Sequence, residues 1–138
     1  MLKYAAAYAA TLVVMVALDM VWLGIVAKPM YQQGLAHLMA ARPVIPVAVL
    51  FYLVYALGLV IFGVAPASAG GWVQAAAGGA LFGFFAYATY DLTNWATLKD
   101  WPWLLSLLDM AWGAAVSAVS AVAGQAAWQK LGEKLGGG

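Results

Sequence analysis

Four long apolar stretches, each long enough to cross a lipid bilayer, divide this chain. They cover residues 4–27, 44–64, 72–98 and 102–128. A helix that crosses the hydrocarbon needs about 20 predominantly apolar residues, and each stretch meets that requirement. Only 8% of all positions are charged, against about 25% in a soluble domain. The sequence therefore predicts a single all-α transmembrane domain over residues 1–138, an integral membrane four-helix bundle.

The few polar residues exclude several classes of function. The formal net charge is +1, so the chain lacks the basic surface by which proteins bind nucleic acid. The absence of cysteine excludes disulfides, thiolate catalysis and cysteine metal sites. His37 and the aspartates are the remaining ligand types, and no spacing such as HExxH joins them, so we expect no metal site. The sequence leaves any cofactor unknown, and the expected partner is the lipid bilayer.

The connection between the first two stretches, residues 29–41, is too polar to span a membrane. Pro29 suits the first turn of a helix, where its missing N–H is not needed. Tyr31, Leu35 and Leu38 recur at helical spacing. This pattern predicts a short helix that lies in the membrane interface.

Three aspartates interrupt the apolar stretches, and they constrain the function most. Asp19, Asp91 and Asp109 belong to the first, third and fourth stretches. With four spans, the first and third end at the same membrane face, and the fourth starts there. At 1.5 Å per residue, the three carboxyl groups lie about 13, 12 and 10 Å below that face. A carboxylate at such a depth must be neutralised, paired or hydrated, and is a functional candidate by default.

If the three aspartates face inward, the bundle holds a polar pocket that opens toward one surface. We take Asp19, Asp91 and Asp109 as the catalytic candidates, and expect at least one of them to carry a proton near neutral pH. The predicted ligand-binding residues are Trp22, Tyr87, Tyr90, Asn94 and Trp112 in the walls, with Lys99 and His37 reaching in from the rim. The segment 29–41 would lie across the mouth.

Each of these features also has an ordinary structural explanation. Polar side chains in spanning helices often only bond neighbouring helices, at roughly 0.6 kcal/mol each. Trp95, Trp101 and Trp103 fit an aromatic belt at the membrane interface. Gly79 and Gly83 have the small-xxx-small spacing that lets two helices approach closely.

The polar passage of the third stretch also resembles a known family. The resemblance rests on Ala-Tyr-Ala-Thr-Tyr-Asp-Leu-Thr-Asn at 86–94, Ala-Thr-Leu-Lys at 96–99, Trp-Pro at 101–102, Asp-Met-Ala-Trp-Gly at 109–113, and Asp19, Trp22, Leu23 and Gly24. These residues resemble the DUF2177 family of small bacterial membrane proteins. The resemblance implies a multi-pass, four-span protein of the bacterial inner membrane, and it implies no particular activity.

Three functions fit these observations. The first is an inner-membrane protein that binds or modifies a lipid-soluble small molecule in a one-sided pocket. The second is a small transporter coupled to protons or cations. The third is an accessory subunit of a larger membrane complex, and a homodimer is compatible with all three. The far half of the bundle has few polar residues beyond Thr11, Ser117 and Ser120, which favours a one-sided pocket over transport.

Overall fold

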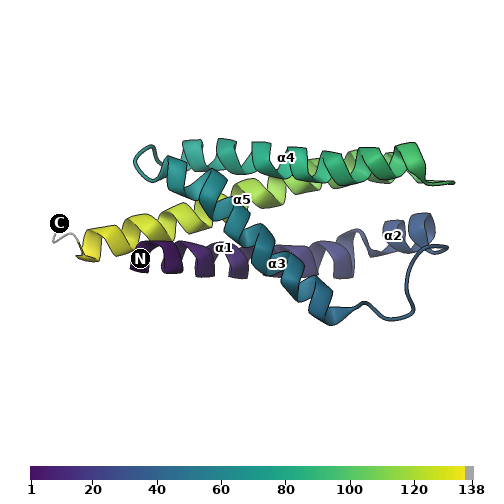
Figure 1. The fold of residues 1–138 in the computed structure, drawn as a ribbon, viewed down its shortest axis with the longest axis horizontal. Coiled ribbons are helices and arrows are strands. Elements are labelled where there is room, and N and C mark those ends of the chain that lie inside the picture. The colour runs from purple at the N-terminus through teal and green to yellow at the C-terminus, as the bar shows by residue number, and fades with distance from the viewer. Residues whose placement is uncertain (136–138) are drawn as a thin grey trace.

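The computed structural model describes residues 1–135, and the regular structure in this range is helical throughout (Figure 1). In chain order the elements are α1 (Leu2–Val21), a π-helical turn η1 (Trp22–Val26), α2 (Lys28–Leu35), α3 (Ile45–Leu59), a second π-helical turn η2 (Val60–Val64), a 3-10 turn η3 (Ala65–Ala67), α4 (Trp72–Thr97) and α5 (Trp103–Leu135). The predicted all-α membrane bundle is confirmed.

Three helical segments are long and apolar enough to cross a membrane. They are Leu2–Val26, Ile45–Ala67 and Trp103–Leu135. Helix α4 has 26 residues but is more polar toward its C-terminus, where Asp91 and Asn94 lie. The spanning role of α4 therefore remains a prediction from its length and its place in the bundle.

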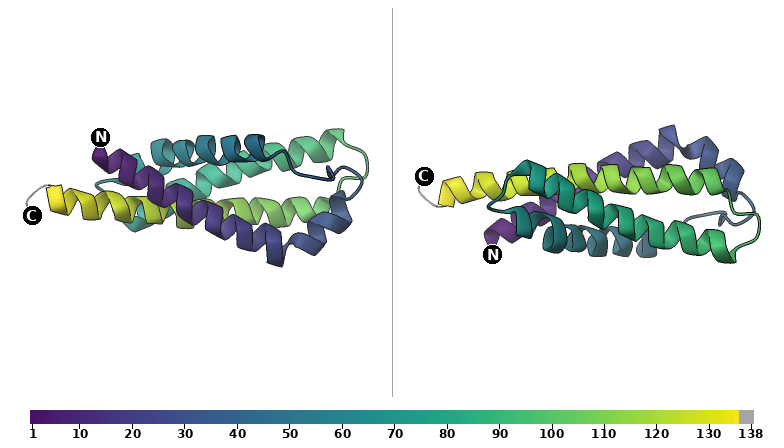
Figure 2. Two further views of the ribbon diagram at one scale, coloured as in Figure 1. Left: turned by 90° about the horizontal axis from the view of Figure 1, so that it is seen from below. Right: turned by 90° about the horizontal axis from the view of Figure 1, so that it is seen from above.

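The helices run back and forth along one axis, so each end of the bundle gathers a different set of helix ends and connections. The start of α1, the end of α5 and the turn between η3 and α4 lie at one end (Figures 1 and 2). The opposite end gathers the C-terminal ends of α1 and α4, the start of α5, and α2 (Figure 1). We call this the α2 end. It is the end at which the three aspartates were predicted to converge.

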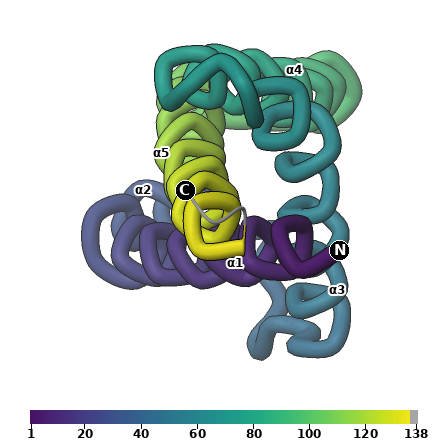
Figure 3. Tube along the Cα trace, turned by 90° about the vertical axis from the view of Figure 1, so that its left-hand side faces the viewer, coloured from purple at the N-terminus to yellow at the C-terminus, as the bar shows by residue number. Residues whose placement is uncertain are grey.

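Helices α4 and α5 pack closely at two glycines of α4, whose spacing predicts a close helix contact. A Cβ atom on Gly79 would lie 2.6 Å from the carbonyl oxygen of Ser117. One on Gly83 would overlap the carbonyl oxygen of Gly113. Viewed from the terminal end, α5 lies between α4 and α1 (Figure 3). The glycine contacts thus fix which face of α4 turns toward α5.

Helix α3 crosses the bundle diagonally (Figure 1). Its extension η2 packs on α4, where a Cβ on Gly63 would lie 3.4 Å from the backbone nitrogen of Gly79. Nearer its N-terminus α3 packs on α1 instead. The two helices α3 and α4 therefore diverge toward the α2 end.

The half of the bundle near the termini is filled by small side chains. Ala7, Val60, Val64 and Ala121 form a buried cluster there. A Cβ atom on Gly124 would overlap the Thr11 hydroxyl and lie 2.9 Å from Val64 Cγ2. The helices are therefore closely packed at this point of the half near the termini.

The helix boundaries differ from the predicted ones at two places. The first span is not one of them: it ends at Val26, before Pro29, although its last turn η1 is π-helical, with the N–H of Ala27 donating to the carbonyl of Trp22 at 2.7 Å. The predicted interfacial segment 29–41 is helical only over Lys28–Leu35. At the other end of the chain α5 continues to Leu135, past the predicted end at residue 128.

Candidate functional site

A cavity of about 490 Å³ lies at the α2 end between α1, α3, α4 and α5. Its lining is mostly aromatic, with two carboxyl groups and a few small or aliphatic side chains. The lining residues are Asp19, Trp22, Leu23, Tyr31, Ala48, Phe51, Tyr52, Tyr55, Ala86, Tyr87, Tyr90, Asp109 and Trp112.

Asp19 links three helices at the base of this cavity. Its side chain on α1 is only 5% exposed. One carboxyl oxygen accepts a hydrogen bond from the Tyr52 hydroxyl of α3 at 2.7 Å. The other accepts from the indole N–H of Trp112 on α5 at 2.8 Å. Each oxygen of this carboxyl group thus accepts a hydrogen bond from a different helix, which fixes its orientation.

Two tryptophans form a flat aromatic wall beside Asp19. The rings of Trp22 and Trp112 stack with centroids 4.4 Å apart and planes 4° from parallel. Each follows an aspartate of its own helix by three residues, Asp19 and Asp109 respectively, so each helix presents acid and ring on one face. The indole nitrogen of Trp22 is buried without a hydrogen-bond partner in the described residues.

Asp109 is held by the short helix α2. The Tyr31 hydroxyl donates to Oδ1 of Asp109, and this hydrogen bond joins α2 to α5. Burial, and then the nearby Asp109 carboxylate, raise the pKa of Tyr31, so this phenol keeps its proton and remains a donor. Helix α2 also lies against the start of α5, because a Cβ added to Gly34 would lie 3.0 Å from Pro102, the residue before α5.

Asp91 lies behind the cavity wall, in the contact between α4 and α5. It is 1% exposed and lies against Asp109. Its Oδ2 atom is buried with no hydrogen-bond partner among residues 1–135. Asp91 therefore places a second carboxyl group close to that of Asp109.

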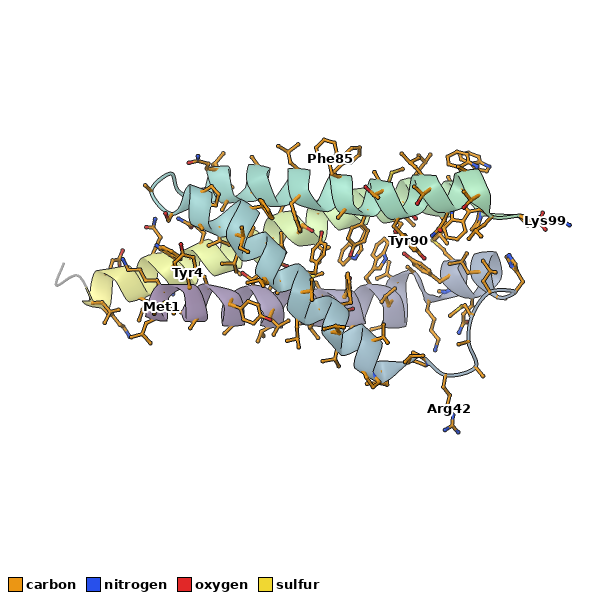
Figure 4. All side chains as sticks on the ribbon, in the orientation of Figure 1. Met1, Tyr4, Arg42, Phe85, Tyr90 and Lys99 are labelled. Carbon is orange, nitrogen blue, oxygen red and sulfur yellow. The ribbon has the colours of Figure 1, made fainter. Side chains whose placement is uncertain are left out.

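The structure brings together six of the ten predicted site residues as cavity lining. These six are Asp19, Trp22, Tyr87, Tyr90, Asp109 and Trp112. Asp91 and Asn94 lie outside the lining, and His37 and Lys99 are exposed. Tyr90 points in toward the bundle, whereas Lys99 points away from it at the end of α4 (Figure 4). The rim contacts predicted for Lys99 and His37 are therefore not formed in the structure.

Sequence reasoning placed the segment 29–41 across the mouth but named no site residue in it, and it left out α3. Tyr31, Phe51, Tyr52 and Tyr55 all line the cavity. Tyr52 and Tyr55 are the only hydrogen-bonding side chains in the span 44–64, which is a signal that could have placed α3 at the site.

From its exposed lining residues on α3 and α4 we infer that the cavity opens on the side of the bundle, between these two helices. Tyr55 closes the inner end of this gap, with its ring centroid 5.2 Å from that of Phe82 and 6.0 Å from that of Tyr87. Toward the α2 end the helices separate, and the lining residues Phe51 and Tyr90 are 43% and 55% exposed. In a spanning bundle such a mouth faces lipid.

No metal site accompanies the cavity in the described part of the chain. Within residues 1–135 no three His, Asp or Glu side chains lie close enough to one another to hold a metal ion.

The fold and the buried polar groups define an all-α membrane protein. The chain belongs to the family described as "Predicted membrane protein (DUF2177)", whose model matches residues 4–126. No curated protein and no solved structure matches the chain. The family match confirms the resemblance found in the sequence. Its description names no ligand or reaction, so a function has to be argued from the cavity.

Proposed function

We propose that this protein binds or modifies a lipid-soluble small molecule in the cavity at the α2 end, in the inner membrane of a bacterium. The cavity carries the proposal. Its volume of about 490 Å³ falls within the range of roughly 300–1,000 Å³ typical of small-molecule sites. Such sites combine an apolar, aromatic lining with a few convergent polar groups, which is the composition found here.

The position of the mouth supports a lipid-soluble ligand. A molecule dissolved in the bilayer can enter between α3 and α4, past Phe51 and Tyr90, without crossing water. A water-soluble ligand would instead have to pass α2, whose Tyr31 is bonded to Asp109.

The polar groups suggest how the ligand is held. Asp19 is fixed by Tyr52 and Trp112, so it acts as an oriented polar anchor. Asp109 lines the cavity with Asp91 behind it, and its carboxyl group could exchange a proton with a ligand atom. General acid–base chemistry needs such a positioned proton carrier. This pair is the part of the site that would support modification in addition to binding.

The packing of the other half supports one-sided binding over transport. A transporter must open its site to both membrane faces. Here the path toward the termini is blocked by the contacts of Gly79 with Ser117 and of Gly124 with Thr11. Saturable uptake of protons or of a cationic dye by vesicles that carry the protein would favour transport instead.

Native mass spectrometry of the protein extracted with its membrane lipids tests the proposal. The variant Ala86→Trp places a large ring in the cavity, because Ala86 is part of its lining. Ala77→Trp is the matched control, since Ala77 is an exposed alanine of the same helix. We expect a bound small molecule in the wild type and the control, and its loss in Ala86→Trp.

Two results of this measurement would contradict the proposal. One is the same set of bound species in all three proteins. The other is a protein partner in fixed stoichiometry with no small molecule, which is the result that an accessory subunit predicts.

A further inference from the structure

We infer that the ligand is a lipophilic organic cation, an alkylammonium group attached to an apolar chain. Its charged nitrogen would lie among the aromatic rings beside Asp19 and Asp109, and the chain would leave through the mouth between α3 and α4. This inference rests on the proposed function, because it names the chemical class of the ligand for that same cavity.

The first argument is the charge of the site. Both oxygens of Asp19 accept hydrogen bonds, and the carboxyl group of Asp109 lines the same cavity. No basic side chain lines the cavity. Buried charge is costly unless it is paired, so a cation bound in the cavity would pair with these carboxyl groups.

The basic residues of the α2 end do not supply that charge. Lys28, Arg42 and Lys99 are exposed and none of them lines the cavity. Arg42 and Lys99 extend away from the bundle (Figure 4). The negative charge of the cavity is therefore available to a ligand.

The second argument is the aromatic lining. The π faces of Trp and Tyr attract cations, most strongly where water is excluded, and cages of such rings are the usual binding sites of quaternary ammonium groups. The stacked pair of Trp22 and Trp112 stands beside Asp19, and Tyr87 and Tyr90 line the same space. A ring cage next to a carboxylate is suited to an organic cation.

The third argument separates an organic cation from a metal ion. A metal ion would need several oxygen or nitrogen ligands around one point, and the described residues offer no such group. The cavity lining also includes Leu23, Ala48 and Phe51, which suit a hydrocarbon chain. The cation can be the ammonium headgroup of a membrane lipid or a free amphiphilic amine, since both present the same chemistry.

The test compares two probes that differ only in charge. One is dodecyltrimethylammonium, and the other is the uncharged analogue in which a carbon atom replaces the nitrogen. Binding of each to the purified protein is measured by native mass spectrometry in an uncharged detergent. We expect the charged probe to bind at least about tenfold more tightly, the effect of one or two desolvated cation–π contacts and a carboxylate.

Matched variants assign this preference to the cavity. Asp19→Asn keeps the size of the side chain and can keep both hydrogen bonds, and it should remove most of the preference. Asp109→Asn provides a second, independent removal of charge. Asp100→Asn removes the same charge from an exposed residue at the same end and should leave the preference intact. Asp100 has a φ of 58°, a backbone conformation that asparagine tolerates well.

The outcomes separate this inference from the proposed function. Equal binding of the two probes, lost for both in Ala86→Trp, would overturn the cationic ligand and leave the small-molecule site in place. A preference unchanged in Asp19→Asn and Asp109→Asn would also overturn it. Phosphatidylcholine is a third probe in the same measurement. If none of the three probes binds, and no bound species is lost in Ala86→Trp, both proposals are rejected. Binding of phosphatidylcholine supports a lipid headgroup as the source of the cation, and binding of the simple amine alone supports a free amphiphile.

Discussion

Replacing Trp112 by phenylalanine tests the hydrogen bond that positions Asp19. The variant keeps an aromatic ring against Trp22 but removes the indole N–H that donates to Asp19 at 2.8 Å. Hydrogen bonds between side chains in membranes contribute about 0.6 kcal/mol on average. Bonds to charged groups contribute about 1.5–3 kcal/mol. Because the acceptor here is a buried carboxylate, we expect a loss of about 1.5 kcal/mol in the free energy of unfolding.

The control is Trp128→Phe on the same helix. Trp128 packs edge-on against Tyr4 at a centroid distance of 4.6 Å, so this change removes a similar ring area without that hydrogen bond. Unfolding is followed by circular dichroism while sodium dodecyl sulfate is added to the purified protein in mild detergent. The difference between the two variants isolates the bond to Asp19.

A double-mutant cycle completes this prediction. If the bond to the carboxylate causes the loss, Trp112→Phe should cost clearly less in an Asp19→Asn background, because the bond then joins two neutral groups. A difference from Trp128→Phe below about 0.5 kcal/mol, or full additivity with Asp19→Asn, would refute the reasoning.

Three further predictions concern packing, the short helix α2 and pH. Gly83→Ala should lower the free energy of unfolding by about 1–3 kcal/mol, because the added methyl group would overlap the carbonyl oxygen of Gly113. Gly24→Ala, which meets no atom within 4 Å, should cost under about 0.5 kcal/mol in the same assay; equal effects would contradict the close α4–α5 contact. Tyr31→Phe should raise amide hydrogen exchange across Lys28–Leu35 about tenfold, since it removes the bond to Asp109, and unchanged exchange would show that this bond does not hold α2. The folded state raises the pKa of Tyr31, so above about pH 10 the phenol ionises first in the unfolded protein. The difference in the free energy of unfolding between wild type and Tyr31→Phe should therefore be constant up to about pH 10 and decrease above it. A gain that shrinks between pH 7 and 9 would contradict this assignment.

The convergence of Asp19 and Asp109 could be predicted from the sequence by counting residues. Helical rise fixes depth, and four spans fix which helix ends share a face, so both carboxyl groups were expected in one layer. The tryptophans at Trp22 and Trp112 followed from the same helical spacing. These predictions required no knowledge of how the helices tilt or rotate.

The position of Asp91 could not be predicted because it depends on the rotation of α4. Gly79 and Gly83 contact α5, so the face of α4 that carries them lies in the interface between the two helices. Asp91 lies on the same buried face of α4. Tyr87 and Tyr90 then face the cavity. Spacing alone grouped all of these residues on one broad face and could not tell which part of it meets α5.

The tyrosines of α3 were missed for a similar reason. The tilt of α3 is set where η2 packs on α4, and this tilt swings Tyr52 to Asp19. The predicted reach of Lys99 fails because the chain leaves α4 at Leu98 in an extended conformation, with ψ of 142°. Packing geometry and chain direction of this kind are not encoded in residue spacing.

Photocrosslinking in intact membranes tests the lipid-facing cavity most directly. A benzoylphenylalanine replaces Phe51, which lines the mouth of the cavity, or Phe85, which points outward from α4 (Figure 4). Both phenylalanines are exposed, so the two positions differ mainly in whether they adjoin the cavity. After irradiation the adducts are identified by mass spectrometry. We predict one enriched adduct at position 51 that a saturating cavity ligand displaces, and a sample of the bulk lipids at position 85. The same mixture of bulk lipids at both positions would contradict the account.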